Sequence, residues 1–417
     1  MVRLLYLLLF LSLCFPFSLM GLKAGCLFLL LFFSILRFFF LKGQSYRIKY
    51  WHWFVGYFFT GFFALLYGTL KDNPGTHFYY LVYCVWPIVY PLIFSLLRFD
   101  SLDKIKRLFE ISYVFIFITG MISFMQLNFG LFSFFDREFF GYGDSDSARP
   151  MFLVISFTGG AVVQFFVLFC FLLSYYTIDS KVLTFKKYFL LVLGMLYIVL
   201  SSRRIMMFGF FYIPLIIWLS SVLTHINNST RLFSNVIKIY TVPIILLIVG
   251  ISYIFIDFSD ASTFFSSAFS SDGDLGSEEN ARLEQYAALL KGWHENFFLG
   301  AGTGIDAGVT RSDIPGTYEL SYMAILFERG IIGGVAYFLL LFSPVVWSIS
   351  LAKKCADMKT KQFLLSYNSC YVALIIANAT NPYISTYDFV WIIFLFVAVI
   401  NIVDRRLQYE EKNMCYS

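Results

Sequence analysis

The sequence predicts an all-α integral membrane protein, and two observations lead to this prediction. Of the 417 residues, 59% are hydrophobic and only 14% are charged, and the mean hydropathy is +0.75. A soluble protein of this composition could not bury its apolar surface in one core. The apolar residues also occur in runs of about 20, which is the length that a helix needs to cross a bilayer. These properties exclude a soluble globular fold.

About twelve apolar runs follow one another along the chain, so we expect about twelve transmembrane helices. The first run follows Arg3 and lacks a small-residue cleavage site, so we expect a retained helix rather than a removed signal peptide. The run at 188–201 is short for a span. The runs lie near 4–20, 24–41, 51–70, 77–97, 108–130, 151–177, 188–201, 205–223, 236–256, 319–348, 363–379 and 385–403.

The basic residues predict the orientation of these helices. Most of the 31 Lys and Arg residues fall in alternate connections, which the positive-inside rule places in the cytoplasm together with both termini. They form no basic patch, so we expect no nucleic acid as a partner. The opposite side then carries the SSRR turn at 201–204, a long loop at 257–318 and the NATNPYI connection at 378–384.

The long loop divides the chain into four parts. Residues 1–256 form a membrane bundle of about nine runs, residues 257–318 form one large outer loop, residues 319–403 form a second bundle of three runs, and residues 404–417 form a cytoplasmic tail. The loop carries ten Asp and Glu residues against three Lys and Arg residues. A loop of this length in a compact protein is usually functional or disordered.

Within the loop, we expect a flexible piece followed by a helix. The stretch 259–277 is rich in Ser. From Ser277 onward the pattern predicts an amphipathic helix with Ser277 as its N-cap. Its apolar face is expected to contain Leu283, Ala287 and Leu290.

Cysteine, histidine and glycine patterns predict no metal and no cofactor. All seven Cys residues fall in apolar runs or on the cytoplasmic side, and the four His residues are scattered, so neither a disulfide framework nor a metal site is expected. The GAGTG segment at 300–304 does not follow a strand, so it does not predict a nucleotide site. Its glycines instead predict a tight turn where the backbone approaches a helix end.

Three arginines on the outer side are candidate phosphate ligands. Arg203 and Arg204 stand where cations are normally depleted, and the guanidinium fork suits phosphate oxygens. Interfacial anchoring is the alternative for these two residues. Arg282 precedes the glycine-rich segment, and its alternative role is a solvated ion pair with Glu278 or Glu279.

Glu319 is the candidate catalytic carboxylate. It falls in the first turn of the run at 319–348, where a capping role is the alternative. In a continuous helix, Gly330 and Gly333 would share the direction of Glu319, whereas Glu328 would point the opposite way.

The two ionisable residues deeper in this run are expected to have structural partners. Glu328 and Arg329 are adjacent, so they do not face each other on a helix. Buried charges are normally satisfied, and Asp388 is the candidate partner of Arg329.

These features resemble the superfamily of bacterial O-antigen polymerases and O-antigen ligases. The resemblance covers about 200–335 and rests on the SSRR turn, an Arg ahead of the NFFLGAGTG segment, and a polar residue before an LxxLxExGxxG pattern. Ligases of this group carry a His-Asn-like pair, nine variable residues and then GxxG. Here Glu319 and Leu320 stand at the position of that pair, which favours a repeat-unit polymerase.

The resemblance implies a metal-independent glycosyltransferase of the integral-membrane C type in the bacterial inner membrane. An O-antigen polymerase would join undecaprenyl-diphosphate-linked repeat units at the periplasmic face, during synthesis of lipopolysaccharide O-antigen or a related surface polysaccharide. Its partners would be the lipid-linked donor and acceptor glycans, the membrane lipids and a chain-length regulator protein. The alternatives are an O-antigen ligase acting on lipid A-core and a flippase or transporter of lipid-linked glycan, although the early runs contain almost none of the charges expected of a transporter.

A mechanism follows from this expectation. Transfer of a glycan from a lipid diphosphate requires stabilisation of the leaving charge and deprotonation of the acceptor hydroxyl. We expect Arg203, Arg204 and Arg282 to bind the donor diphosphate, and Glu319 to act as the general base. Aromatic residues are candidates to stack on sugar rings, with interfacial anchoring as the alternative. These candidate sugar contacts are Tyr286, Trp293, Tyr318 and Tyr322.

Overall fold

The computed structural model of the chain is a bundle of helices with one pair of two-residue strands. It describes residues 1–40, 50–143, 150–151, 154–155, 159–178, 184–201, 203–225, 234, 237, 239–241, 275–309 and 316–416. Within this part of the chain, seven helices are long and apolar enough to cross a membrane. The prediction of an all-α membrane architecture is confirmed at this level.

The first half of the bundle contains mainly apolar helices joined by short connections. Their bounds are α1 (Val2–Cys14), α2 (Met20–Phe40), α3 (Trp51–Leu70), the 3-10 helix η1 (Thr76–Tyr79), the π-helix η2 (Leu81–Val85), α4 (Trp86–Phe94) and α5 (Ser101–Phe129). The second half adds α6 (Gly160–Ile178), α7 (Phe185–Leu200), α8 (Arg204–Leu223), α11 (Leu275–Glu295), α12 (Ser321–Lys354), α13 (Met358–Asn378) and α14 (Tyr387–Tyr416).

Several helices differ from the apolar runs that predicted them. α1 ends at Cys14, because Pro16 disfavours helical backbone in the residue before it. The run at 77–97 is not one regular helix, since η1, η2 and α4 follow one another there. The run at 151–177 becomes helical only at Gly160, after the antiparallel strands β1 (Pro150–Met151) and β2 (Val154–Ile155). Most of the run at 236–256 and of the loop before residue 275 lies outside the described residues.

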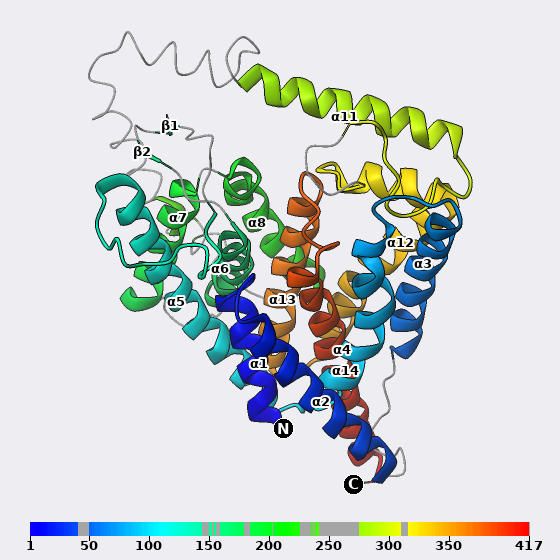
Figure 1. Ribbon diagram of the computed structural model, residues 1–417. Helices are drawn as coiled ribbons and strands as arrows, with labels where there is room; N and C mark the ends of the chain where they lie inside the picture. The colour runs from blue at the N-terminus through cyan, green and yellow to red at the C-terminus, as the bar shows by residue number, and fades with distance from the viewer. Residues whose placement is uncertain are drawn as a thin grey trace.

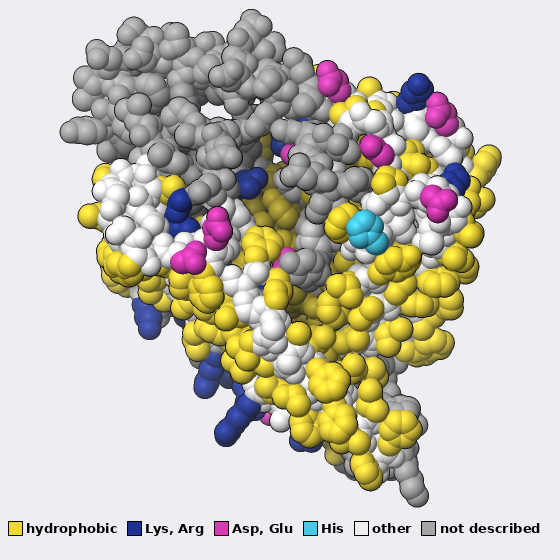
Figure 2. Space-filling model, in the orientation of Figure 1, with side chains coloured by type: hydrophobic (Ala, Val, Ile, Leu, Met, Phe, Trp, Pro, Cys, Tyr) yellow, Lys and Arg dark blue, Asp and Glu magenta, His cyan; other side chains and the backbone are white. Residues whose placement is uncertain are grey.

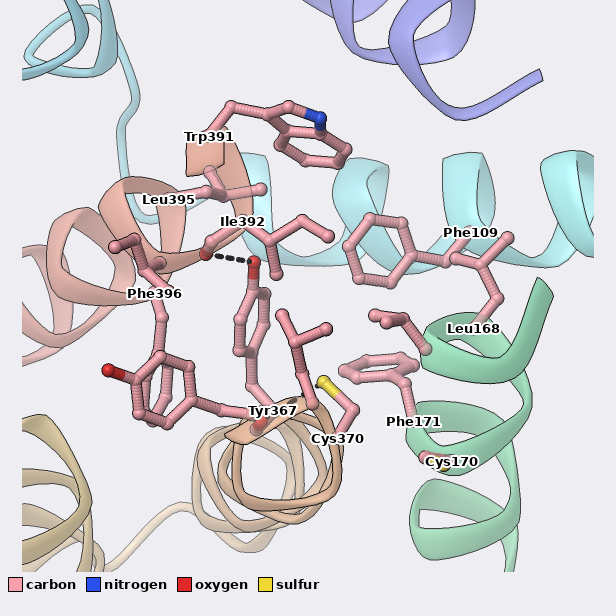
Figure 3. Packing of buried hydrophobic residues seen from close by; sticks show 14 of the residues in the cluster. Phe109, Leu168, Cys170, Phe171, Tyr367, Cys370, Trp391, Ile392, Leu395 and Phe396 are labelled. Carbon is pink, nitrogen blue, oxygen red and sulfur yellow. Dashed lines mark hydrogen bonds between the residues drawn. The ribbon is translucent and has the colours of Figure 1, made fainter. Parts of the chain in front are cut away.

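The core of the bundle surrounds α6, in which every residue is buried. Figure 3 shows side chains of α5, α6, α13 and α14 meeting at one point of this core. The Tyr367 ring of α13 stacks on Phe396 of α14 with centroids 4.9 Å apart, and its hydroxyl donates a hydrogen bond to the carbonyl of Ile392. α6 therefore has no lipid-facing side, whereas helices such as α8 expose large apolar side chains including Phe211.

The two ends of the bundle differ in charge. Figure 1 shows both chain termini at one end and α11 lying across the opposite end. In Figure 2, hydrophobic side chains cover the middle of the visible face, and Lys and Arg side chains project near the end that carries the termini. Asp and Glu side chains gather toward the α11 end on this face. Lys and Arg side chains also lie near the α11 end on this face, so the acidic side chains are what distinguish that end.

Candidate functional site

α12 is interrupted at Gly330, where the backbone has φ 62° and ψ −171°. In a continuous helix the amides of residues 331 and 332 would bond to the carbonyls of residues 327 and 328. The segment 297–302 is inserted at this break and replaces both helical bonds. The replacing bonds are Ile331 N to Phe297 O (2.8 Å), Ile332 N to Phe298 O (3.4 Å), Ala301 N to Phe327 O (2.8 Å) and Gly302 N to Glu328 O (2.9 Å).

The glycine-rich segment can approach this break because three of its glycines have left-handed backbone. Gly300, Gly302 and Gly304 have φ values of 78°, 90° and 77°. A Cβ atom at Gly300 would lie 2.3 Å from the carbonyl oxygen of Glu328. The prediction of a tight turn close to a helix backbone is therefore confirmed, although the turn meets a break inside α12 rather than a helix end. The assumption of a continuous helix, which placed Gly330 and Gly333 in the direction of Glu319, is wrong.

The glycine-rich segment is also bonded to the C-terminal part of α3 and to the residues that follow it. Thr303 N donates a hydrogen bond to Ala64 O at 3.0 Å. The Asn73 side chain donates to Ala301 O and Thr303 O at 3.1 and 3.3 Å, and Thr76 Oγ1 donates to Thr303 O at 3.0 Å. The carbonyl of Ala64 and the side chains of Asn73 and Thr76 would be costly to bury without partners, and the segment 301–303 supplies these partners.

α11 packs on α12 through a second, smaller hydrophobic cluster. This cluster contains Leu289, Ala301, Tyr318, Ala324 and Phe327. We expected the apolar face of this helix to contain Leu283, Ala287 and Leu290, but Leu283 is 65% exposed and Ala287 is exposed as well. Gln285 and Leu289 are fully buried instead. α11 also begins at Leu275, so Ser277 lies inside the helix rather than at its N-cap.

Gln285 explains why α11 is rotated in this way. Its Oε1 atom accepts hydrogen bonds from the amides of Glu319 and Leu320 at 3.1 and 3.3 Å. These amides precede the first residue of α12, Ser321. A side chain from α11 thus accepts hydrogen bonds from the backbone amides just ahead of α12. The N-cap residue of α12, Leu320, makes no side-chain capping bond of its own.

Arg282 and Glu319 are in direct contact. Arg282 Nε donates a hydrogen bond to Glu319 Oε2 at 2.9 Å, and their side chains are 37% and 26% exposed. Glu319 lies in the connection just before α12, rather than in its first turn. The structure therefore brings the two residues that we expected to be catalytic to one place. The side chains of Glu278 and Glu279, the alternative partners of Arg282, lie outside the described part of the structure.

Arg203 and Tyr383 are electrostatically linked to this pair. Arg203 is the half-buried residue that precedes α8. Burial raises the pKa of the Tyr383 phenol, and the charges of Arg203, Glu319 and Arg282 all act on that phenol. Arg203, Arg282, Glu319 and Tyr383 come from four separate segments of the chain. Arg204 is the first residue of α8, and its side chain lies outside the described part of the structure.

The four aromatic candidates differ in their availability. Tyr286 is 43% exposed, so its ring is open to a ligand. Tyr318 is buried, and its hydroxyl is engaged by Ile305 O and Ala307 N. Tyr322 donates to the carbonyl of Ile375. Trp293 is half-buried and packs against Phe297 with ring centroids 5.3 Å apart.

Glu328 and Arg329 are both buried and have different surroundings. Glu328 Oε1 accepts a hydrogen bond from Gly304 N at 3.2 Å, so it ties the glycine-rich segment to α12. The Arg329 guanidinium lies between the rings of Tyr83 and Tyr337, 4.6 Å from each centroid. Its three nitrogens have no hydrogen-bond partner among the described residues, so the expected pairing with Asp388 does not occur.

The sequence did not indicate two residues of this site. Gln285 is an uncharged residue in a loop helix, and only the position of α12 gives it a role. Tyr383 belongs to the NATNPYI connection, which the orientation rule assigned to the outer side without identifying any single residue. In chemical terms, the site combines two guanidinium groups, one carboxylate and one phenol, which suits an anionic ligand beside a hydroxyl that loses a proton.

Comparison of the sequence with protein-family models and with curated proteins gave no match.

Proposed function

We propose that this protein is an O-antigen polymerase, a membrane glycosyltransferase that joins undecaprenyl-diphosphate-linked repeat units. The observation that supports this proposal most directly is the hydrogen bond between Arg282 and Glu319, beside Arg203 and Tyr383. A cation cluster next to one carboxylate can serve both halves of a transfer from a lipid diphosphate. The guanidinium groups stabilise the departing diphosphate, and the carboxylate accepts the proton of the attacking hydroxyl.

In this proposal the growing chain is the donor and the incoming repeat unit is the acceptor. Arg203, Arg204 and Arg282 bind the donor diphosphate. A bond forms between the acceptor hydroxyl oxygen and the anomeric carbon of the donor glycan, while the bond from that carbon to the diphosphate breaks. The hydroxyl proton moves to Glu319, and the diphosphate leaves with the electron pair of the broken bond.

The ion pair in the substrate-free protein fits such a reaction. A diphosphate carries more negative charge than one carboxylate, and it offers several oxygens to the Arg282 fork. Binding of the donor therefore draws Arg282 away from Glu319. The carboxylate then loses the cation that neutralised it and becomes available to the acceptor hydroxyl.

The proposed setting is the bacterial inner membrane, with about twelve spans in total. The end of the bundle that carries α11 faces the periplasm, and both termini face the cytoplasm. Tyr286 is the aromatic candidate with an exposed ring, so it is the one that we assign to sugar contact. A chain-length regulator would act from outside this chain. The reaction uses no metal ion and no nucleotide sugar.

The test is the surface polysaccharide of a strain that lacks this protein, complemented with variants. A polymerase mutant should leave lipid A-core capped with a single repeat unit, and wild-type protein should restore the ladder of longer chains. Glu319→Gln should give the single-unit pattern at normal protein level. Lys291→Gln is a matched control, because Lys291 is an exposed cation of the same helix as Arg282.

The alternatives give different patterns in the same experiment. Loss of all attached O-antigen, with polymer still present on the carrier lipid, would indicate a ligase. Loss of periplasmic repeat units altogether would indicate a translocation defect. A full ladder from the Glu319→Gln variant would exclude Glu319 as the base.

A further inference from the structure

The connection between α13 and α14 holds Tyr383 in a fixed backbone position. Asn378 Oδ1 accepts a hydrogen bond from Ile384 N at 2.8 Å. Tyr383 N donates to Asn381 O at 2.8 Å, and Thr386 Oγ1 donates to Tyr383 O at 2.8 Å. The residues on either side of the phenol are therefore tied to the ends of two core helices.

The Tyr383 ring is packed as well. Its centroid lies 5.9 Å from that of Phe389, in an edge-to-face arrangement at 74°. Ile384, the next residue, is fully buried. The hydroxyl consequently has little freedom to turn toward bulk solvent, and its position is set by the fold rather than by a flexible loop.

This hydroxyl is buried and has no hydrogen-bond partner among the described residues. A buried polar group without a partner is costly, so such groups usually have a reason. The phenol lies within the electrostatic influence of Arg203, Arg282 and Glu319. It does not bond to Glu319, although it lies near that carboxylate, whose Oε2 accepts from Arg282. The hydroxyl is therefore available to donate a hydrogen bond to a ligand.

The surrounding charges indicate the chemistry of that ligand. Two guanidinium groups next to a neutral donor form a site for an anion with several oxygens. Because burial raises the pKa of Tyr383, the phenol stays protonated at neutral pH and acts as a donor rather than as a base. A neutral donor adds a hydrogen bond to the anion without adding charge.

We propose that the Tyr383 hydroxyl donates a hydrogen bond to a diphosphate oxygen of the donor lipid, beside Arg203 and Arg282. This inference rests on the proposed function, since it assumes a lipid diphosphate as the ligand. It adds a fourth segment, the α13–α14 connection, to the substrate-contacting groups. Tyr383 would thereby stabilise the negative charge of the leaving group as the glycosidic bond breaks.

The contact can be measured by binding alone. The probe is undecaprenyl diphosphate added to the purified full-length protein in detergent, with inorganic diphosphate as a second probe for the headgroup without the lipid. We expect Tyr383→Phe to bind undecaprenyl diphosphate about tenfold more weakly than wild type, the loss typical of one hydrogen bond to a charged group. The matched control is Tyr371→Phe, in which a buried hydroxyl that donates to Leu341 O at 2.8 Å is lost; its affinity should stay within about twofold of wild type.

The binding measurement separates this inference from the proposed function. If wild-type protein binds the lipid but never polymerises repeat units, the proposed function fails. The Tyr383 contact is then still tested by the ratio of the wild-type and Tyr383→Phe affinities for undecaprenyl diphosphate. Equal affinities of Tyr383→Phe and wild type would overturn the contact even in an active polymerase. If the Phe variant does not fold, 3-fluorotyrosine at position 383 keeps the ring and strengthens the donor. Tighter binding is then expected, and unchanged binding would refute the contact.

Discussion

Arg282 Nε and Glu319 Oε2 lie 2.9 Å apart, and this hydrogen bond connects α11 to the residue that precedes α12. Both side chains are partly exposed, at 37% and 26%. Exposed ion pairs contribute about 0–1 kcal/mol to stability. The pair is therefore too weak to explain why α11 stays on the bundle, a role that the buried Leu289 and Gln285 fulfil. In the proposed function the pair contributes through its chemistry rather than through stability.

Exchanging the two charges tests this distinction. The double variant Arg282→Glu, Glu319→Arg should keep an ion pair, so the free energy of unfolding should change by less than about 1 kcal/mol. Polymer synthesis should be lost, because the carboxylate would then lie at position 282 and the guanidinium group at position 319. Thermal unfolding in detergent and a polysaccharide gel measure the two effects. The corresponding exchange of Arg406 and Glu410 on α14 should leave polymer synthesis unchanged, although it also removes the stacking of Arg406 on Phe99. An active Arg282/Glu319 exchange variant would make the pair structural.

Gln285 is expected to stabilise the start of α12. Replacing it with Met preserves size but leaves the amides of Glu319 and Leu320 without their acceptor, which should cost about 1–2 kcal/mol of unfolding free energy. Glu319 should also become less well positioned, so polymer chains should shorten. Chemical denaturation is the measurement. Glu284→Gln, at an exposed position of α11, should show no change, and equal stability of the two variants would contradict the capping role.

Gly330 should tolerate no side chain. A Cβ atom there would lie 2.3 Å from the Phe298 carbonyl oxygen, and the positive φ is unfavourable for alanine. We expect Gly330→Ala to lower the free energy of unfolding by about 2–4 kcal/mol. Gly25→Ala in α2 is the control, because a Cβ atom at Gly25 meets nothing within 4 Å and helical alanine is favoured by about 1 kcal/mol. If Gly330→Ala had the melting temperature of the wild type, α12 would not be interrupted at Gly330 in the way described.

Arg329 should be replaceable by an apolar residue when Glu328 is neutralised with it. Its guanidinium stacks between two tyrosine rings and makes no hydrogen bond to a described residue. Replacing both members of a buried pair of opposite charges by neutral groups is often neutral or stabilising, whereas removing one member leaves the other uncompensated. Because the charges of Arg329 and Glu328 act on each other, we expect the double variant Glu328→Gln, Arg329→Met to unfold within about 1 kcal/mol of wild type and to remain active. Arg329→Lys should be less stable, because lysine loses the planar stacking. The opposite order of stability would mean that the positive charge itself is required.

Much of this arrangement follows from local sequence. Apolar runs predicted α3 to the residue, because its ends are marked by polar residues on both sides. The glycines of the 300–304 segment predicted close backbone approach, since left-handed backbone is a local property of glycine. The arginines were notable because cations are scarce in the connections assigned to the outer side, and Glu319 because it stands at the start of a long apolar run.

The remaining features depend on contacts between distant segments. The packed face of α11 is set by Gln285 reaching amides 34 and 35 residues away, so a hydrophobicity pattern alone selected the wrong residues. The break in α12 needs a second segment to receive its backbone groups. The Arg329 guanidinium contacts the rings of Tyr83 and Tyr337. The sequence around Tyr83 does not predict this contact. Tyr383 became a candidate only through its neighbours from three other segments.

The segment 297–302 supplies backbone bonds that α12 would otherwise make within itself. Cutting this stretch out of the chain would strip two amides and two carbonyls of their partners in the middle of an apolar helix. A protein shortened in this way should fail to fold. Deletions in the loop should therefore be tolerated only before residue 297. Insertions in related proteins are expected before α11, where they would leave the backbone hydrogen bonds between segment 297–302 and α12 intact.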